Sequence, residues 1–119
     1  MMANRLIAKG KIVLVPFPYD DFSQLKVRPA VCLTNEIGYY NQIVIAFITS
    51  SIPENPEPSD VLILSSSHEF NQTGLKLNSA VRLHRLASVP SHTIINALGK
   101  MPFVIMQEIN SKLKILFDI

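Results

Sequence analysis

The stretch SQLKVRPAVCLTN, residues 23–35, passes from a polar approach into a short apolar run of the kind that forms a buried strand. Pro29 heads that run, where a missing backbone N–H does least harm, so a strand is predicted over residues 29–34. A residue that precedes proline is biased toward extended backbone, which would hold Arg28 at the rim of the predicted sheet. A guanidinium at that place is either a solvated cap on the strand or a cation held for chemistry.

Further strands are predicted on both sides of this run. Upstream, KIVLV at residues 11–15 is β-branched and closed by prolines, which indicates a first strand. Downstream, IVIAFITSS at residues 43–51 indicates a largely buried third strand, and VLIL at residues 61–64 a fourth. The intervening IPENPEPSD, residues 52–60, carries three prolines and is typical of a solvated connection.

The second half of the chain changes from a period of two residues to a helical period. A half-exposed strand is predicted over residues 75–89, because Val81 and Leu83 face one way while Arg82 and His84 face the other. The following HTIINALGK is compatible with a short strand or a helical turn. From Pro102 onward the apolar residues recur at the spacing of an amphipathic helix, at Ile105, Ile109, Leu113 and Leu116.

Several short strands followed by one terminal helix predict a mainly β (α+β) fold. The expected architecture is a small, strongly bent β-barrel packed against a C-terminal amphipathic helix, with residues 1–119 forming one domain.

Composition narrows the class of protein further. With 119 residues, 48% hydrophobic and 17% charged, the chain should form one folded core. A net charge of +2 is compatible with binding to a polyanion. The basic residues are not clustered in blocks, however, so charge alone does not identify a nucleic-acid binder. The single cysteine, Cys32, is predicted to be a buried, inert thiol. No zinc-type spacing, signal peptide or membrane-length apolar run is found, so we expect a cytoplasmic protein without a metal or cofactor.

Three groups of residues could carry chemistry. The first is the polar loop and its exit, with Asp20, Asp21, Ser23, Gln24, Lys26 and Arg28. The second is the hydroxyl cluster Thr49, Ser50 and Ser51, which ends a buried strand and could form an anion site if it lies beside the arginine of the loop exit. The third is the pair Arg82 and His84, which suits metal-free phosphate chemistry because histidine titrates near neutrality. Each group also has an ordinary interpretation as solvated loop, strand end or surface.

Four segments together resemble the PemK/MazF family of bacterial toxin endoribonucleases. They are GKIVLVPFPYDDFSQLKVRPAVCLT, the strand end ITS at residues 48–50, GLKLNSAVRLHRL from Gly74, and ALGKM before the last helix. The resemblance covers nearly the whole chain from Gly10, and the K-x-R-P-A-V piece is its most specific element.

The resemblance implies a fold, a reaction and partners. It implies a bent barrel of the CcdB/PemK type, similar to Src-homology-three barrels, usually as a homodimer. Members of the family cleave single-stranded RNA without metal and are held inactive by a cognate antitoxin, and DNA would be met only through the antitoxin complex.

The resemblance also assigns roles by position. The family's catalytic arginine falls on Arg28 and its strand-end threonine on Thr49, with Ser50 beside it, and Arg82 falls where some members carry a second functional arginine. His84 stands where several members carry an acidic residue, so proton transfer could pass to an imidazole. The implied RNA-binding residues are Arg82 and, from the loop over the RNA site, Asp20, Ser23, Gln24 and Lys26.

Two other functions remain open. A gyrase poison of the related CcdB type would share the barrel, but those proteins resemble one another in a tryptophan-containing tail, and this chain has no tryptophan. A non-catalytic barrel that binds a protein partner would tolerate loss of Arg28.

Overall fold

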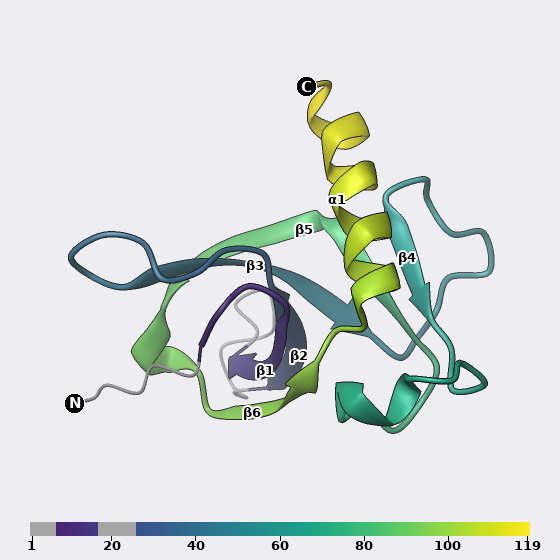
Figure 1. Ribbon diagram of the computed structural model, residues 1–119, viewed down its shortest axis with the longest axis horizontal. Helices are drawn as coiled ribbons and strands as arrows, with labels where there is room; N and C mark the ends of the chain where they lie inside the picture. Colours follow the sequence, from purple (N-terminus) through teal and green to yellow (C-terminus); the bar gives the residue numbers. More distant parts are fainter. Residues whose placement is uncertain (1–6, 17–25) are drawn as a thin grey trace.

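The computed structural model describes residues 7–16 and 26–119, and within them six strands form one strongly curved antiparallel sheet with a single α-helix at its C-terminal end (Figure 1). The order of the strands across the sheet is β4-β5-β3-β2-β1-β6. The strands are β1 (Lys11–Pro16), β2 (Val27–Cys32), β3 (Gln42–Thr49), β4 (Asp60–Ile63), β5 (Ser79–Pro90) and β6 (Asn96–Lys100). The helices are the 3₁₀ turns η1 (Phe70–Thr73) and η2 (Ser91–Thr93) and the helix α1 (Phe103–Phe117). The predicted mainly β fold with a bent sheet and a terminal helix is confirmed.

The curvature of the sheet buries its central strands on both faces. Alternate residues of β1, β2 and β3 enter two separate apolar clusters, so that Ile12 and Val31 belong to one and Val13 and Ala30 to the other. The first cluster lies between the sheet and α1, and it includes the fully buried Ile109 of that helix. Burial on both faces explains why these strands are nearly continuous apolar runs in the sequence.

Three parts of the chain differ from the sequence-based prediction or were left open by it: the segment after β5 and the first residues of β5 and β2. The segment after β5 is neither purely strand nor purely helix, because the turn η2 precedes the edge strand β6. The strand predicted to start at Leu75 begins at Ser79, and the polar stretch before it contains η1. The second strand begins at Val27, so Pro29 lies inside it and not at its head.

Pro29 is tolerated inside β2 because of the side to which its backbone points. The carbonyl of Cys32 accepts from Gly10 on the β1 side, whereas the N–H of Leu33 donates to Val44 of β3. Backbone groups of an antiparallel strand alternate between its two neighbours, so the missing N–H of Pro29 falls on the β3 side. The β2–β3 ladder runs only from Ala30 to Cys32, and it therefore ends one residue before the proline would interrupt it.

A bulge changes the direction of β5 at its middle. Residues 82–85 of β5 lie opposite Phe47 alone, because the β3–β5 register shifts between Ala46 and Ile48. A bulge of this kind bends its strand and re-aims side chains. The first part of β5 consequently pairs with both β4 and the end of β3, and its later part pairs with the beginning of β3.

Helix α1 stands beside β4 and β5 (Figure 1). Its predicted apolar face is confirmed for Ile105, Ile109 and Leu113, which pack against the core cluster, while Leu116 remains exposed. Among the described residues, no helix is long and apolar enough to cross a membrane.

A close approach between η1 and β6 requires glycine at position 74. Gly74 follows η1 with φ of 74°, and a Cβ there would overlap the main-chain oxygen of Leu98 in β6. Gly38 has a nearly equal φ of 76°, but a Cβ at that position would meet nothing within 4 Å. The two glycines therefore share a backbone requirement and differ in packing.

We predict that Gly74→Ala destabilises the fold more than Gly38→Ala does. The left-handed backbone should cost each variant about 1 to 2 kcal/mol, and the overlap with Leu98 should cost Gly74→Ala about 1 to 3 kcal/mol more. Denaturant unfolding of both variants measures the difference directly. Equal free energies of unfolding would contradict the proposed close approach.

Cys32 is fully buried as a free thiol, as predicted. Burial raises the pKa of its thiol to about 11, and this effect outweighs the opposing influence of the Lys11 charge. Because the folded state holds the thiol proton more tightly than the unfolded state does, this contribution to stability is full below about pH 9 and declines as the pH rises through 11.

We therefore expect Cys32 of the native protein to resist thiol reagents at pH 8. Titration with an aromatic disulfide reagent should detect almost no thiol in the native protein and one thiol per chain after denaturation. The Cys32→Ala variant supplies the blank for both measurements. Rapid labelling of the native protein would show that the β2 core opens easily.

Candidate functional site

Arg28 and Thr49 face each other where the β2–β3 ladder has ended. The last pairs of that ladder join Ala30 to Phe47 and Val31 to Ala46, and extending this register by two residues brings Arg28 opposite Thr49. Directly opposed residues of antiparallel strands project from the same face. Both side chains are half-buried, and both line the two cavities that flank this gap between the strands.

The smaller cavity, of about 200 Å³, is lined by three arginines and one threonine. Its lining residues are Arg28, Phe47, Ile48, Thr49, Arg82 and Arg85. Among the described residues of this lining none is a carboxylate, and three arginines stand beside one hydroxyl. Planar guanidinium groups bind phosphate oxygens through paired, charge-assisted hydrogen bonds, which makes this cavity suited to a phosphate.

The larger cavity, of about 380 Å³, extends from the same pair toward the loop before β5. Its lining residues are Val27, Arg28, Pro29, Ile48, Thr49, Ser50, Ser51, Leu75, Lys76, Leu77 and Ser79. Both apolar and polar residues line it. Such a lining suits a ligand with one charged part and one flat, apolar part.

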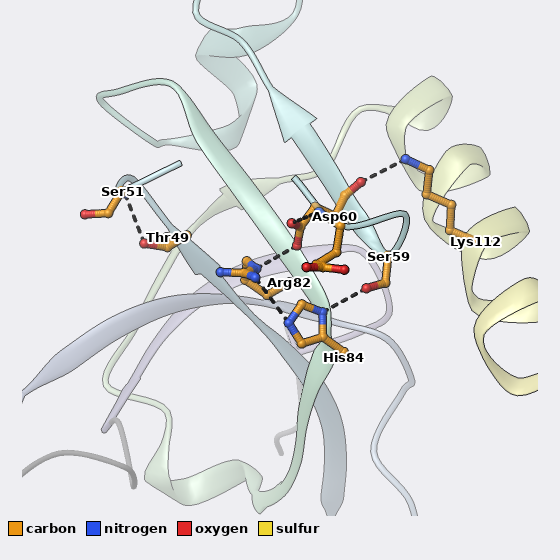
Figure 2. A network of polar contacts seen from close by, with 8 residues as sticks. Thr49, Ser51, Ser59, Asp60, Arg82, His84 and Lys112 are labelled. Atoms are coloured by element: carbon orange, nitrogen blue, oxygen red, sulfur yellow. Dashed lines mark hydrogen bonds and ion pairs between the residues drawn. The ribbon is translucent and has the colours of Figure 1, made fainter. Parts of the chain in front are cut away.

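The hydroxyl of Thr49 is oriented by the chain that follows it. The backbone N–H of Ser51 donates to Thr49 Oγ1 over 3.0 Å (Figure 2). A hydroxyl that accepts such a bond still carries its own hydrogen as a donor. On the opposing strand, Arg28 Nη1 donates to the carbonyl of Val27 over 3.3 Å, which keeps that guanidinium close to its own strand.

Arg82 is the centre of a polar network that joins β4 to β5 (Figure 2). Its Nε donates to Asp60 Oδ1 over 2.6 Å, and its Nη2 lies 3.2 Å from His84 Nε2. On the far side of the imidazole ring, Nδ1 of His84 lies 2.8 Å from Ser59 Oγ. Ser59, which directly precedes β4, thus contacts His84 of β5, and Asp60, the first residue of β4, contacts Arg82.

The hydrogen bonds assign one tautomer to His84. A guanidinium can only donate, so His84 Nε2 must accept the bond from Arg82 and therefore carries no proton. The imidazole is then neutral with its proton on Nδ1, which donates to Ser59 Oγ. The arrangement leaves a lone pair on the nitrogen that faces Arg82.

The structure brings together most of the predicted catalytic residues. Arg28, Thr49 and Ser50 line the larger cavity, and Arg82 joins Arg28 and Thr49 at the smaller one. His84 lines neither cavity and reaches the site through its bond to Arg82.

The predicted RNA-binding residues of the loop have a mixed outcome. Lys26 lies exposed directly before β2, close in the sequence to the larger cavity. Asp20, Ser23 and Gln24 lie outside the described residues.

Two residues of this region were not predicted from the sequence. Arg85 lines the smaller cavity, although strict alternation places it on the face opposite Arg82; the bulge in β5 removes that alternation. The sequence predicts that Asp60 belongs to a solvated connection, and this prediction is wrong, because its side chain is 0% exposed and forms an ion pair with Arg82. The wrong prediction arose because the three prolines before Asp60 are typical of an exposed loop. Within residues 7–16 and 26–119, no three His, Cys, Asp or Glu side chains gather as metal ligands do.

Comparison with known proteins places this geometry in context. Residues 8–117 match the model of a family described as the PemK-like, MazF-like toxin of type II toxin–antitoxin systems. No curated protein matches the sequence significantly.

Three solved structures share the fold. The Mycobacterium tuberculosis toxin MazF-mt6 is 17% identical with a TM-score of 0.69, and the match covers 92% of this chain and 97% of that one. An endoribonuclease in complex with its cognate antitoxin, from a mycobacterial species, is 15% identical with a TM-score of 0.72 over 95% and 96% of the two chains. A MazE–MazF structure from Deinococcus radiodurans is 21% identical with a TM-score of 0.73 over 98% and 99%. At these identities the likeness establishes the curled sheet and its helix.

Proposed function

This chain belongs to the PemK-like, MazF-like toxins of type II toxin–antitoxin systems, and from that premise we propose that it is a metal-independent endoribonuclease that cleaves single-stranded RNA, mRNA above all. The observation that carries the proposal is the meeting of Arg28, Thr49 and Arg82 around one small cavity. Three guanidinium groups and a hydroxyl supply the charge and the donors that a phosphodiester requires as it gains negative charge.

The proposed reaction uses the nucleophile that RNA itself carries. The ribose 2′-oxygen loses its proton to a base and attacks the adjacent phosphorus, and the bond from phosphorus to the 5′-oxygen breaks as that oxygen takes up a proton. The products are a 2′,3′-cyclic phosphate and a 5′-hydroxyl end. DNA lacks the 2′-hydroxyl, so only RNA is a substrate.

Each site residue has a role in this scheme. Arg28 stabilises the additional charge on the phosphorane, and Thr49 donates its hydroxyl hydrogen to a phosphate oxygen, with Ser50 as a second hydroxyl beside it. Arg82 supplies a second cation from the facing strand. His84 takes part in proton transfer from its place beside Arg82, to which its Nε2 is hydrogen-bonded.

The larger cavity offers room for a neighbouring nucleotide. Lys76 and the exposed Lys26 provide cations for the RNA backbone, and Leu77 provides an apolar wall for a base. The loop residues Asp20, Ser23 and Gln24 complete the proposed RNA-binding set.

The proposed partners are a cognate antitoxin and a second copy of this chain. Both need apolar surface, and exposed apolar side chains lie at the two ends of α1 and in the C-terminal tail that follows it: Phe103, Val104, Ile115, Phe117 and Ile119. Contact with DNA would occur only through the antitoxin complex.

We expect Arg28→Ala to lower RNA cleavage about 10²- to 10³-fold, because one donor to the developing charge is lost. Purified protein is incubated with single-stranded RNA in excess EDTA, and an oligonucleotide with 2′-O-methyl groups serves as the substrate that lacks a nucleophile. Lys114→Ala, an exposed change in the last turn of α1, is the control for loss of a positive charge elsewhere. Undiminished cleavage by Arg28→Ala, or strict dependence on a divalent ion, would contradict the scheme.

A matched pair of threonine variants tests the second contact. Thr49→Val should lower cleavage by a similar factor, since the hydroxyl that donates to phosphate is removed. Thr34→Val removes a hydroxyl that lies two residues beyond β2 and accepts from the backbone N–H of Val44 in β3, outside both cavities at the gap, and it should alter stability more than cleavage. Equal losses of activity per folded molecule in the two variants would count against the role of Thr49.

In cells, induced expression of the wild-type chain should arrest growth, and Arg28→Ala should not. Co-expression of a small partner encoded beside the gene should restore growth. Harmless expression without that partner would contradict the toxin assignment for this chain. Arrest that persists in Arg28→Ala together with broken DNA would indicate a gyrase poison, and arrest with intact RNA and DNA would indicate a barrel that acts by binding a protein.

A further inference from the structure

The carboxylate of Asp60 is the most completely buried charged group that touches the site. Its side chain is 0% exposed, whereas the side chain of its partner Arg82 is 22% exposed. A buried carboxylate is tolerated only when its oxygens are paired. Both are: Oδ1 accepts from Nε of Arg82 over 2.6 Å, and Oδ2 accepts from the backbone N–H of Glu57 over 2.8 Å.

The two carboxylate oxygens of Asp60 have different hydrogen-bond partners, and only Oδ1 contacts Arg82. Because the Glu57 N–H occupies Oδ2, Asp60 binds the guanidinium at Nε. One terminal nitrogen, Nη2, is directed at His84. The guanidinium is a rigid plane, so contacts at these two points fix its orientation (Figure 2). Arg82 also lines the cavity shared with Arg28 and Thr49.

The charge of Asp60 matters as much as its position. Arg28, Arg82 and Arg85 all line one cavity of about 200 Å³, so the positive charges of the other two arginines repel that of Arg82. A carboxylate in direct contact with Arg82 offsets part of that repulsion from outside the cavity. It thereby allows Arg82 to remain at the site before a phosphate arrives.

Asp60 is itself held from two sides. It lies directly opposite Arg82 in the β4–β5 register, and the N–H of Leu83 donates to the carbonyl of the preceding Ser59 over 3.1 Å. From the terminal helix, Lys112 Nζ donates to the main-chain carbonyl of Asp60 over 2.8 Å. The residue that orients Arg82 is thus attached to both the sheet and α1.

From these contacts, and on the premise of the proposed ribonuclease function, we infer that Asp60 is a positioning residue: it holds Arg82 in the orientation in which that arginine contacts the reacting phosphate. Asp60 touches no substrate. Its effect on cleavage is exerted entirely through Arg82.

The principal test is Asp60→Asn, which retains the size of the side chain but provides only one acceptor oxygen for two donors. We expect kcat to fall about 10- to 100-fold with little change in KM, because a misplaced guanidinium loses a contact made in the transition state. In an Arg82→Ala background, Asp60→Asn should produce no further loss. Glu108→Gln breaks the surface ion pair of Lys112 on α1 and is the matched control, with wild-type kcat expected.

Two additional measurements keep the inference testable if Asp60→Asn folds poorly. Asp60→Glu retains the charge and moves it by one methylene group, so it should lose kcat if position is what matters. The Nε–H signal of Arg82 in NMR spectra, identified by its absence in Arg82→Ala, should exchange slowly in the wild type and rapidly in Asp60→Asn. Activity is expressed per folded molecule, from thermal melting.

The outcomes separate this inference from the function on which it rests. If the wild type cleaves RNA and Asp60→Asn has the same kcat, the positioning role is overturned and the ribonuclease function stands. The same conclusion follows if Asp60→Asn lowers kcat as much in the Arg82→Ala background as in the wild type. A wild type that cleaves no RNA overturns the function and, with it, the role of Asp60. If Asp60→Asn lowers only kcat, and has no further effect in the Arg82→Ala background, both the positioning role and the ribonuclease function are supported.

Discussion

The backbone N–H that Pro29 lacks is the constraint on which the site depends. It would point toward β3, and the β2–β3 ladder ends one residue earlier, at the pair of Ala30 and Phe47. Beyond that pair, β3 continues alongside β5 while the beginning of β2 remains paired with β1. Two strands that diverge inside a continuous sheet leave a gap between them, and Arg28 and Thr49 stand on its two sides. A residue that would ordinarily weaken a sheet here accompanies the gap that the candidate site lines.

The residues of the site are held in place in two different ways. Arg28 and Thr49 are half-buried on strands that belong to the central sheet, so their positions depend on the backbone. Arg82 is positioned by a buried carboxylate from the edge strand, and that carboxylate in turn contacts the last helix through Lys112. Since an isolated buried charge is far more costly than a paired one, the Asp60–Arg82 contact should persist when exposed ion pairs such as Lys112–Glu108 exchange with water.

The same fold is reached at 15–21% identity to the solved structures compared above, and the physical reason lies in what the core requires. Strands buried on both faces need apolar residues of suitable size, and many combinations satisfy that need. The gap at Pro29 and the bulge in β5 are irregularities in strand pairing, which a packed core does not by itself supply. Function therefore has to be argued from the few residues at these irregular places and not from the barrel itself.

The sequence by itself determined the strands of the core, the terminal helix and the burial of Cys32, because period-two and helical patterns report directly on which side chains can reach a core. It also singled out Arg28, since a proline restricts the residue before it. Only the tertiary structure decided which of the polar residues meet. Arg85 reaches the smaller cavity because a bulge cancels the alternation, and Asp60 is buried because α1 and β5 cover it from segments more than twenty residues away. Neither event leaves a local signal, because both depend on pairing between distant segments of the chain.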